Sequence, residues 1–355
     1  MTGSRLAVLF AALCAMAGPA LARPFNQLWV FGDSTVDSGW YRKAPYSGEA
    51  NYDFYIKQSA AAVGRPTSSP GPMSVEVLAT AIGVTAKPAN QGGTDYATGG
   101  ARDAQANTAT SGGFLNAVPT RTQLVEYMRL HKLTLGLELQ TSRNLYVISS
   151  GGNDVAFAIK NFTSTTDATN YITNAADTLA ATIKQLSGPP FGFAIRRVHI
   201  IVVGLPESFG TAEQQQYRQL HDTTLQARLH ALHVPYVWAD LDGVRKLIES
   251  FENGPSPFNI SHYTTANPAC PKPVPNSNPT VTTDWAYVCS PSNLAATQPA
   301  NAAASEFADD AHWATGAQAV LGSYLYCLAQ KTWPGQGWPA SNANLPFACS
   351  NFPML

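Results

Sequence analysis

The chain has 355 residues, of which 45% are hydrophobic and only 13% are charged, and its formal net charge is −1. Because the net charge is close to zero and no run of basic residues occurs, the sequence lacks the positive patch expected of a nucleic-acid-binding protein. The length allows one large domain or two ordinary ones, and the hydrophobic content supports a sizeable core.

The first 22 residues have the pattern of a secretory signal peptide. A positively charged start precedes the apolar stretch Leu6–Ala17, and Ala20–Ala22 forms a small-residue cleavage site. The apolar stretch is too short to span a membrane, and no later segment has the ~18 consecutive apolar residues that a span needs. We therefore expect cleavage after Ala22, a mature domain over residues 23–355, and a secreted or periplasmic protein without a membrane segment.

Short apolar runs predict strands that are buried on both faces, at Leu28–Phe31, Leu145–Ile148, Val198–Val203 and Tyr236–Ala239. Helical patterns occur between and after these runs, at Ser74–Ile82, Pro119–His131, Ala175–Leu186, Thr211–His230 and beyond His312. Strands that alternate with helices favour an α/β fold with a parallel sheet.

Two long loops interrupt this pattern. Residues 42–73 are rich in Gly, Pro, Ser and Tyr, and residues 253–301 are rich in Pro, Asn and Thr. Long loops in a compact domain commonly form lids or binding segments, so both are predicted to shape a ligand site. Because no internal repeat or clear domain boundary is found, one domain with long insertions is the simpler interpretation.

The stretch VFGDSTVDSG places Ser34 directly after the first predicted strand. Ligands bind at the carboxyl ends of the strands in open α/β sheets, so Ser34 would lie at that edge. Gly, Asp and Ser are also ordinary turn residues, and a serine hydroxyl is a weak nucleophile without a base. The stretch therefore predicts either a plain turn or a nucleophilic serine.

The segment FADDAHWATGAQA supplies a candidate base, His312, with Asp309 three residues before it. A carboxylate at this spacing can accept a hydrogen bond from the imidazole and hold the tautomer whose other nitrogen faces a hydroxyl. Before a predicted helix, Asp309 could instead be a helix cap. The adjacent Asp310 cannot share the role, because only one of the two side chains can orient His312.

Two glycine-rich segments could donate N–H groups to an oxyanion. DYATGGAR covers residues 95–102, and ISSGGNDV, over residues 148–155, places Asn153 after a predicted strand. Glycine lets the backbone approach a ligand closely, and acyl transfer needs donors for the developing negative charge. Each segment taken alone could equally be a tight turn.

Taken together, the four segments resemble the GDSL, or SGNH, hydrolase family. The matching residues, in the family's order, are Gly32-Asp33-Ser34, Asp95–Ala101, Gly151-Gly152-Asn153-Asp154 and Asp309-Asp310-Ala311-His312. Segments 113–125 and 202–206 also look similar to the longer, plant-like and bacterial outer-membrane-esterase-like branch. The resemblance spans roughly residues 27–327 and implies a three-layer α/β/α, flavodoxin-like fold with long loop insertions.

The resemblance implies a role for each matched residue. Ser34 would be the nucleophile, His312 the base, and Asp309 the acid that orients the imidazole. The oxyanion would be held by the Ser34 backbone N–H, the Gly100 N–H and the Asn153 side-chain amide. Such a mechanism needs no metal and no cofactor.

Three positions depart from the family's usual pattern. Thr35 follows the serine where the family often has Leu, and this change does not touch the chemistry. Asp95 replaces the usual Asn, which loosens the match and leaves Gly99 as an alternative to Gly100. Trp313 follows the histidine in place of Pro and would either line the acyl pocket or belong to the core.

The mature chain keeps four cysteines, Cys270, Cys289, Cys327 and Cys349. An even number in an exported chain suggests two disulfides, for which three connectivities exist, and four buried free thiols are the alternative. The most local pairing joins Cys270 to Cys289 and Cys327 to Cys349. No Cys-x-x-Cys pair occurs, so a zinc ribbon is not expected.

We expect an exported, monomeric serine esterase or lipase that acts on a small-molecule or lipid ester and binds no nucleic acid. A carbohydrate O-deacetylase, or a phospholipase that also transfers acyl groups, fits the same four segments. A binding protein that kept the fold and lost activity is a third hypothesis, but it would not need all five candidate residues. No Gly-x-Ser-x-Gly or His-Glu-x-x-His segment occurs, which argues against an α/β-hydrolase elbow and a metalloprotease.

Overall fold

The computed structural model describes residues 23–45, 53, 64–68, 71–108, 116–131, 143–187, 198–263, 268–270, 285–289, 302–339 and 341–355. The predicted signal peptide and much of the two predicted long loops lie outside these described residues. Within the described part of the chain, no helix combines the length and apolar character needed to cross a membrane.

The described strands form one parallel sheet in the order β1-β2-β3-β4, with the bounds β1 Gln27–Gly32, β2 Asn144–Ser149, β3 Val198–Val203 and β4 Val237–Ala239. Each strand agrees with one predicted apolar run to within a residue or so, which is the usual uncertainty of strand ends. β2 and β3 are buried along their whole length, as expected for parallel strands that helices cover on both faces. The predicted α/β fold with a parallel sheet is therefore confirmed.

A short extended segment flanks β1 on the edge that β2 leaves free. The Tyr96 N–H donates to the Val30 carbonyl at 2.8 Å, and the Val30 N–H donates to the Thr94 carbonyl at 3.1 Å. These bonds form a parallel bridge between Val30 and Asp95. If this segment is counted as the second strand along the chain, the five strands lie in the order 2-1-3-4-5, as in flavodoxin-like sheets. Ligands of such sheets bind at the carboxyl edge, between the first and third strands, where the strand order reverses.

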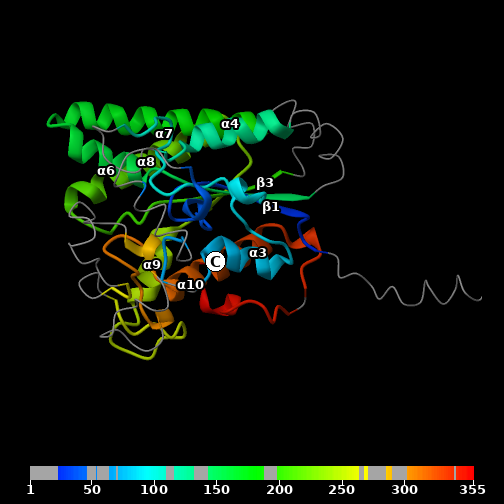
Figure 1. Ribbon diagram of the computed structural model, residues 1–355. Helices are drawn as coiled ribbons and strands as arrows, with labels where there is room; N and C mark the ends of the chain where they lie inside the picture. Colours follow the sequence, from blue (N-terminus) through cyan, green and yellow to red (C-terminus); the bar gives the residue numbers. More distant parts are fainter. Residues whose placement is uncertain are drawn as a thin grey trace, which may run out of the picture.

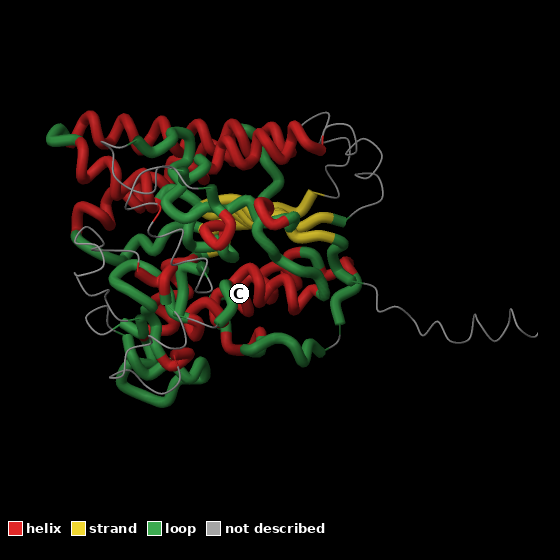
Figure 2. Tube along the Cα trace, in the orientation of Figure 1, coloured by secondary structure: helices red, strands yellow, loops and turns green. Residues whose placement is uncertain are grey.

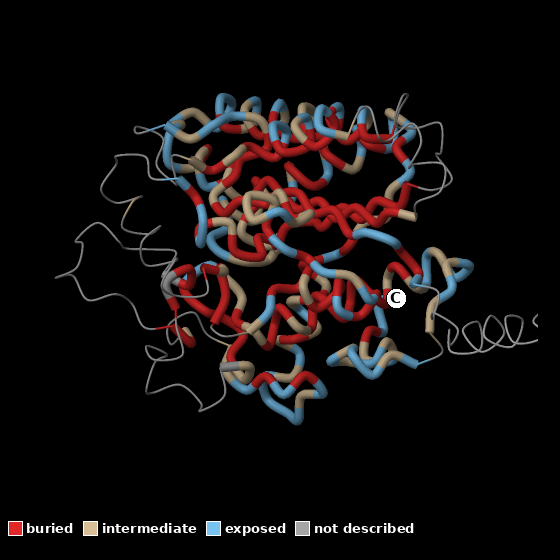
Figure 3. The backbone as a smooth tube through the Cα atoms, turned by 45° about the vertical axis from the view of Figure 1, so that its right-hand side comes forward, coloured by how far each residue is buried: buried red, intermediate tan, exposed pale blue. Residues whose placement is uncertain are grey.

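Helices cover both faces of the sheet, which makes three layers (Figures 1 and 2). One face carries α3 (Ser74–Ile82), α9 (Leu241–Glu249) and α10 (Thr315–Thr332), and the other carries α4 (Thr120–His131), α7 (Thr165–Ser187) and α8 (Ala212–Ala231), with α6 (Gly152–Asn161) beside α7 and α8. Alternate residues of β1 serve the two layers, because Leu28 and Val30 pack into one apolar cluster and Trp29 and Phe31 into the other. Figure 3 shows the sheet buried between the layers and the exposed residues gathered on the outer faces of the helices.

Two disulfides close local loops, joining Cys270 to Cys289 and Cys327 to Cys349 across sequence separations of 19 and 22 residues. A closed loop of this size stabilises a fold by about 3 kcal/mol in the chain-entropy description. The Cys327–Cys349 bond ties α10 to the C-terminal segment. The Cys270–Cys289 bond lies against the loop before α10, since the Cys270 N–H donates to the Ala308 carbonyl at 2.9 Å.

Candidate active site

Ser34 follows β1 directly, at the carboxyl edge of the sheet. The preceding Gly32 has a φ of +140°, and a Cβ there would lie 1.8 Å from the Ser149 carbonyl oxygen of β2. Only glycine fits so close to a neighbouring strand. The buried side chain of Gln123 binds both sides of this residue, accepting from the Gly32 N–H at 2.7 Å and donating to its carbonyl at 2.8 Å. The approach of the chain to Ser34 is therefore fixed from α4 and from β2.

The second segment is tied to the turn after Ser34 by two buried aspartates. Asp95 accepts the N–H of Ser38 at 2.9 Å with one oxygen and the N–H of Ala97 at 2.9 Å with the other. Asp37 accepts the N–H groups of Gly39 at 2.8 Å and Gly99 at 2.9 Å. These carboxylates hold the two segments side by side, so Asp95 has a structural role here.

The peptide groups of Gly99 and Gly100 differ in what they bind. The Gly99 N–H donates to Asp37, and the Gly99 carbonyl accepts the Tyr41 hydroxyl at 2.6 Å. Gly100 has a φ of +77° and lines the pocket beside Ser34. No described residue accepts a hydrogen bond from the Gly100 N–H. The Gly100 N–H is thus the donor of the pair that remains for a ligand.

Asn153 lies in the first turn of α6, where it lines the same pocket. Its Nδ2 donates to the Ala101 carbonyl at 3.0 Å and makes a longer contact of 3.4 Å to Asp33 Oδ2. The first bond anchors the amide, while the second is weak enough at this distance to be exchanged for a ligand oxygen. Burial raises the pKa of Asp33 to about 6, against the lowering effect of its bond from the Thr35 N–H.

His312 and Asp309 lie on a tight turn before α10. Phe307 and Trp313 form an antiparallel bridge, and the Ala308 N–H donates to the His312 carbonyl at 2.7 Å. The turn places His312 Nδ1 at 3.0 Å and 2.9 Å from the two carboxylate oxygens of Asp309. The alternative of Asp309 as a helix cap is wrong, because α10 begins at Thr315.

The Asp309 carboxylate is fully buried and is stabilised in its charged form. It accepts the backbone N–H of His312 at 2.7 Å, of Ala311 at 2.9 Å and of Ala286 at 3.0 Å. Burial alone would favour the protonated acid, but the facing imidazole and these N–H groups outweigh it and lower the pKa of Asp309. The two neighbouring aspartates therefore differ in position: Asp309 is buried and contacts the His312 imidazole, whereas Asp310 is exposed.

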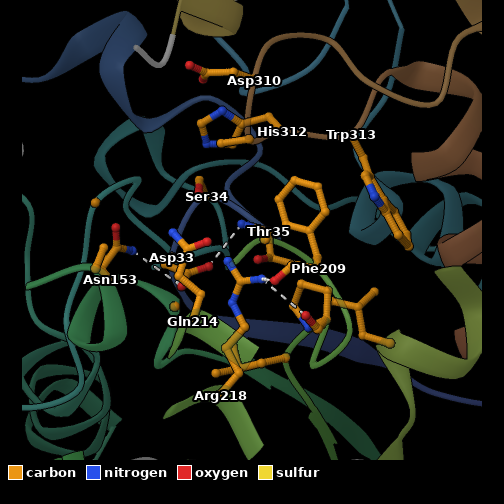
Figure 4. Close-up of a pocket in the computed structure, with 18 of the residues that line it drawn as sticks. Asp33, Ser34, Thr35, Asn153, Phe209, Gln214, Arg218, Asp310, His312 and Trp313 are labelled. Carbon is orange, nitrogen blue, oxygen red and sulfur yellow. Dashed lines mark hydrogen bonds between the residues drawn. The ribbon is translucent and has the colours of Figure 1, made fainter. Parts of the chain in front are cut away.

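One pocket of about 650 Å³ brings together Ser34, Gly100, Asn153 and His312, which lie far apart in the sequence. Figure 4 shows the His312 ring and the Ser34 side chain facing the same space. The pocket is walled by aromatic side chains and by cationic or amide groups, namely Phe157, Phe209, Trp313, Lys160, Gln214 and Arg218. Trp313 lines this pocket and also packs partly against the core cluster. In the described part of the chain, no group of three or more His, Cys, Asp or Glu side chains could hold a metal ion.

A buried charge network fastens the second and third segments together beneath the pocket. His221 is fully buried, with Nε2 at 2.8 Å from Asp103 and Nδ1 at 3.1 Å from Asp222. Asp103 in turn donates its N–H to Asp154 at 2.7 Å. Burial opposes the charged imidazole, but the two carboxylates outweigh it and raise the pKa of His221 well above its usual value. His221 therefore has a structural role, since it joins α8 to Asp103.

Several residues that shape this site carry no signal in the sequence. Gln123 holds Gly32 from a helix of otherwise ordinary amphipathic pattern. The Tyr287 ring lies 5.6 Å from the His312 ring, at an angle of 77°, and comes from the predicted long loop. Phe209 and Arg218 reach the pocket from the β3–α8 connection and from α8. Their positions depend on how loops and helices pack, which local patterns do not encode.

We expect Asn153→Ala to lower kcat by about 10²–10³-fold with little change in KM, the usual cost of one lost oxyanion donor. The reason is that the amide would bind the charge that develops on the ester oxygen, which is absent in the bound substrate. Steady-state kinetics on a short p-nitrophenyl ester measures the effect. Asn161→Ala, an exposed amide at the end of the same helix, is the control. A near-normal kcat in Asn153→Ala would make Asn153 a turn residue only.

The buried acid Glu306 predicts a pH dependence of stability. Both of its carboxylate oxygens are buried without a hydrogen-bond partner among the described residues, and burial, followed by the nearby Glu249 charge, raises its pKa from 4.5 to about 8. The folded protein therefore keeps a proton that the unfolded chain releases, so this contribution is fully present below pH 4.5 and is lost as the pH rises through about 8.

Glu306→Gln keeps the shape of the side chain and removes its titration. We expect the melting temperature of this variant, relative to the wild type, to rise steadily as the pH increases across that interval. Differential scanning calorimetry in buffers between the two pKa values measures it, with the exposed Glu213→Gln as control. A difference that stays constant with pH would show that Glu306 is already ionised in the folded protein.

Comparison with known proteins adds one match. A family model described as GDSL-like Lipase/Acylhydrolase matches residues 28–325. The matched range begins in β1, ends in α10 and contains all four segments that line or support the pocket. A search of curated proteins finds no match.

Proposed function

Because the chain belongs to the GDSL-like lipase/acylhydrolase family, we propose that it is an exported serine esterase or lipase with the triad Ser34, His312 and Asp309. Membership of this family supports the conclusion that the protein is an enzyme that hydrolyses esters. The observation that carries the finer proposal is the Asp309–His312 contact at 2.9 Å beside the same pocket that Ser34 lines. On the surface, an Asp–His contact could be an ordinary ion pair. Here, Asp309 is buried, and His312 lines the same pocket as Ser34.

The reaction would begin with proton transfer from Ser34 to His312. The Asp309 carboxylate accepts a hydrogen bond from Nδ1–H, which favours the tautomer with an unprotonated Nε2, and Nε2 would act as the base. Ser34 Oγ attacks the ester carbonyl and forms a tetrahedral oxyanion. The imidazolium then gives its proton to the departing alcohol oxygen, which leaves an acyl-enzyme. Water, deprotonated by His312, attacks this acyl group, and Ser34 regains its proton as the carboxylic acid departs.

The oxyanion would be held by the backbone N–H groups of Ser34 and Gly100 and by the amide of Asn153. Support for Gly100 rather than Gly99 comes from the Gly99 N–H, which is already bound to Asp37 at 2.9 Å. Asn153 would keep its bond to Ala101 and exchange its 3.4 Å contact with Asp33 for the oxyanion. Such preorganised donors in a pocket that excludes water are commonly the largest single contribution to catalysis.

Export is part of the same proposal. The two disulfides fit an extracellular protein, since such bonds persist in oxidising compartments. We propose that residues 1–22 are a signal peptide and that residues 23–355 form a single domain that acts as a monomer. Mass spectrometry of the secreted protein tests the cleavage site, which is expected after Ala22.

Hydrolysis of a series of p-nitrophenyl esters from acetate to palmitate tests the proposed activity. We expect turnover of at least the shorter esters and complete inhibition by an organophosphonate at one equivalent. The dependence on acyl length separates an esterase from a lipase, and parallel assays with acetylated xylan and with a lysophospholipid address the deacetylase and phospholipase alternatives. A protein that hydrolyses none of these and takes up no phosphonate would instead be a non-catalytic relative.

A further inference from the structure

The active-site pocket contains an arginine that the proposed mechanism does not use. Arg218 extends from α8 into the pocket, and in Figure 4 it lies on the side of Ser34 that faces away from His312. Its Nη1 donates to the Pro206 carbonyl at 3.2 Å and to the Phe209 carbonyl, and its Cζ lies 5.3 Å from the centre of the Phe209 ring. These contacts fix the position of the guanidinium.

The charge of Arg218 is not balanced by a direct partner. Within the described ranges, no carboxylate forms an ion pair with it, and neither Nε nor Nη2 donates a hydrogen bond. Two other arginines do have such partners: Arg228 on the same helix pairs with Asp177 at 2.8 Å, and Arg245 pairs with Glu249. The carboxylates of Asp222 and Asp242 act on Arg218 only at longer range. A half-buried charge without a direct counter-ion costs free energy, which favours a ligand that supplies one.

A second donor lies beside Arg218. Gln214 precedes it by one helical turn on the same face of α8, and both side chains line the pocket. Gln214 uses its Oε1 to accept the Thr211 N–H at 2.8 Å, which leaves its amide NH₂ for the pocket. The exposed Lys160 adds a positive charge at the rim, whereas the carboxylates that line the pocket are the buried Asp33 and the exposed Asp310.

We propose that Arg218, with Gln214, binds an anionic group of the substrate, so that this enzyme prefers esters that carry a carboxylate or a phosphate. The planar guanidinium fork matches both groups, and its contacts are made before substrate arrives. The aromatic wall of Phe157, Phe209 and Trp313 would hold the hydrocarbon that links the anion to the ester. This inference rests on the proposed esterase activity and narrows its substrate class.

Matched ester pairs test the proposal on the wild-type protein. Mono-p-nitrophenyl glutarate is compared with p-nitrophenyl pentanoate, which puts a carboxylate on the acyl part, and 1-butyrylglycerol 3-phosphate with 1-butyrylglycerol, which puts a phosphate on the alcohol part. We expect kcat/KM to be about tenfold to hundredfold higher for the charged member of one pair, the usual value of a hydrogen bond to a charged group. The pair that shows it identifies the source of the anion.

Arg218→Gln should abolish this preference, lowering kcat/KM for the charged ester at least tenfold more than for its neutral partner, since one charged contact is removed and the triad is untouched. Arg218→Lys should keep part of the preference. Arg228→Gln, which removes one positive charge from the same helix outside the pocket, should keep all of it. Equal kcat/KM within both pairs for the wild type, or an equal loss on charged and neutral esters in Arg218→Gln, would overturn the proposal.

A binding measurement separates this proposal from the esterase activity itself. Ser34→Ala protein, which cannot turn over, is titrated calorimetrically with monomethyl glutarate and with glycerol 3-phosphate, alone and combined with Arg218→Gln. Binding that is lost with Arg218→Gln supports the anion site even if no ester is hydrolysed. Binding of neither probe, or binding that does not depend on Arg218, contradicts the anion site even if neutral esters are hydrolysed normally.

Discussion

Ser34→Ala is expected to reduce kcat for ester hydrolysis by about 10⁶-fold, the loss seen when a serine protease loses its nucleophile. The substitution deletes one oxygen at a half-buried position and leaves Gly32 and Gln123 in place, so the melting temperature should stay within about 2 °C of the wild type. The oxyanion donors also remain, and they would account for the residual rate.

Active-site labelling gives this prediction a second, independent readout. A fluorescent organophosphonate should modify the wild type at Ser34 in equimolar amount, as found by peptide mapping, and should not modify Ser34→Ala. Ser250→Ala, an exposed serine at the end of α9, is the matched control and should label normally. Labelling at a different serine, or a Ser34→Ala variant that keeps most of its activity, would refute the assignment of the nucleophile.

Asp309→Asn is expected to lower kcat at least tenfold more than Asp310→Asn, which corresponds to about 1.4 kcal/mol or more in the activation barrier. Loss of the orienting aspartate in a serine protease costs about 10⁴ in kcat, because the imidazole then holds the wrong tautomer. Here the carboxylate also accepts three backbone N–H groups, between 2.7 and 3.0 Å, so an amide NH₂ in its place would face donors. The turn that carries His312 should loosen as well.

The comparison with Asp310 separates the two effects. Asp310 is exposed, and its replacement by Asn keeps the same change in charge within the same turn. Melting temperatures of both variants report the structural part, while kcat measured well below either melting temperature reports the catalytic part. Equal losses of kcat in the two variants, or a larger loss in Asp310→Asn, would contradict the role of Asp309.

Much of the sheet could be predicted, because buried parallel strands are continuous apolar runs with little ambiguity. β3 was found at its predicted bounds, Val198–Val203, and α3 likewise at Ser74–Ile82. α7 begins ten residues earlier than the predicted Ala175, at Thr165, because its first turns are largely polar. α9 was missed although Leu241, Val244 and Ile248 have helical spacing and Asp240 caps it.

Residues of the candidate site could be predicted from the sequence where the local geometry allows only one residue type. The glycine before Asp33-Ser34 is an example, because a Cβ at Gly32 would meet the neighbouring strand. The choice between Gly99 and Gly100 was not accessible, because it depends on a hydrogen bond from Gly99 to Asp37, 62 residues earlier in the chain. Arg218 was missed for the same reason: which face of α8 meets the pocket is set by packing, not by spacing.

The Cys270–Cys289 disulfide lies beside the proposed orienting acid, Asp309, and so could make its position depend on the redox state of the chain. It closes the loop that contains Ala286, whose N–H binds the Asp309 carboxylate at 3.0 Å, and Cys270 itself holds Ala308 at 2.9 Å. We therefore expect the newly made, reduced chain to be latent, with the orienting acid poorly held, and to gain activity as the bond forms. If the chain is exported as proposed, oxidation would thus do here what cleavage of a propeptide does in a zymogen.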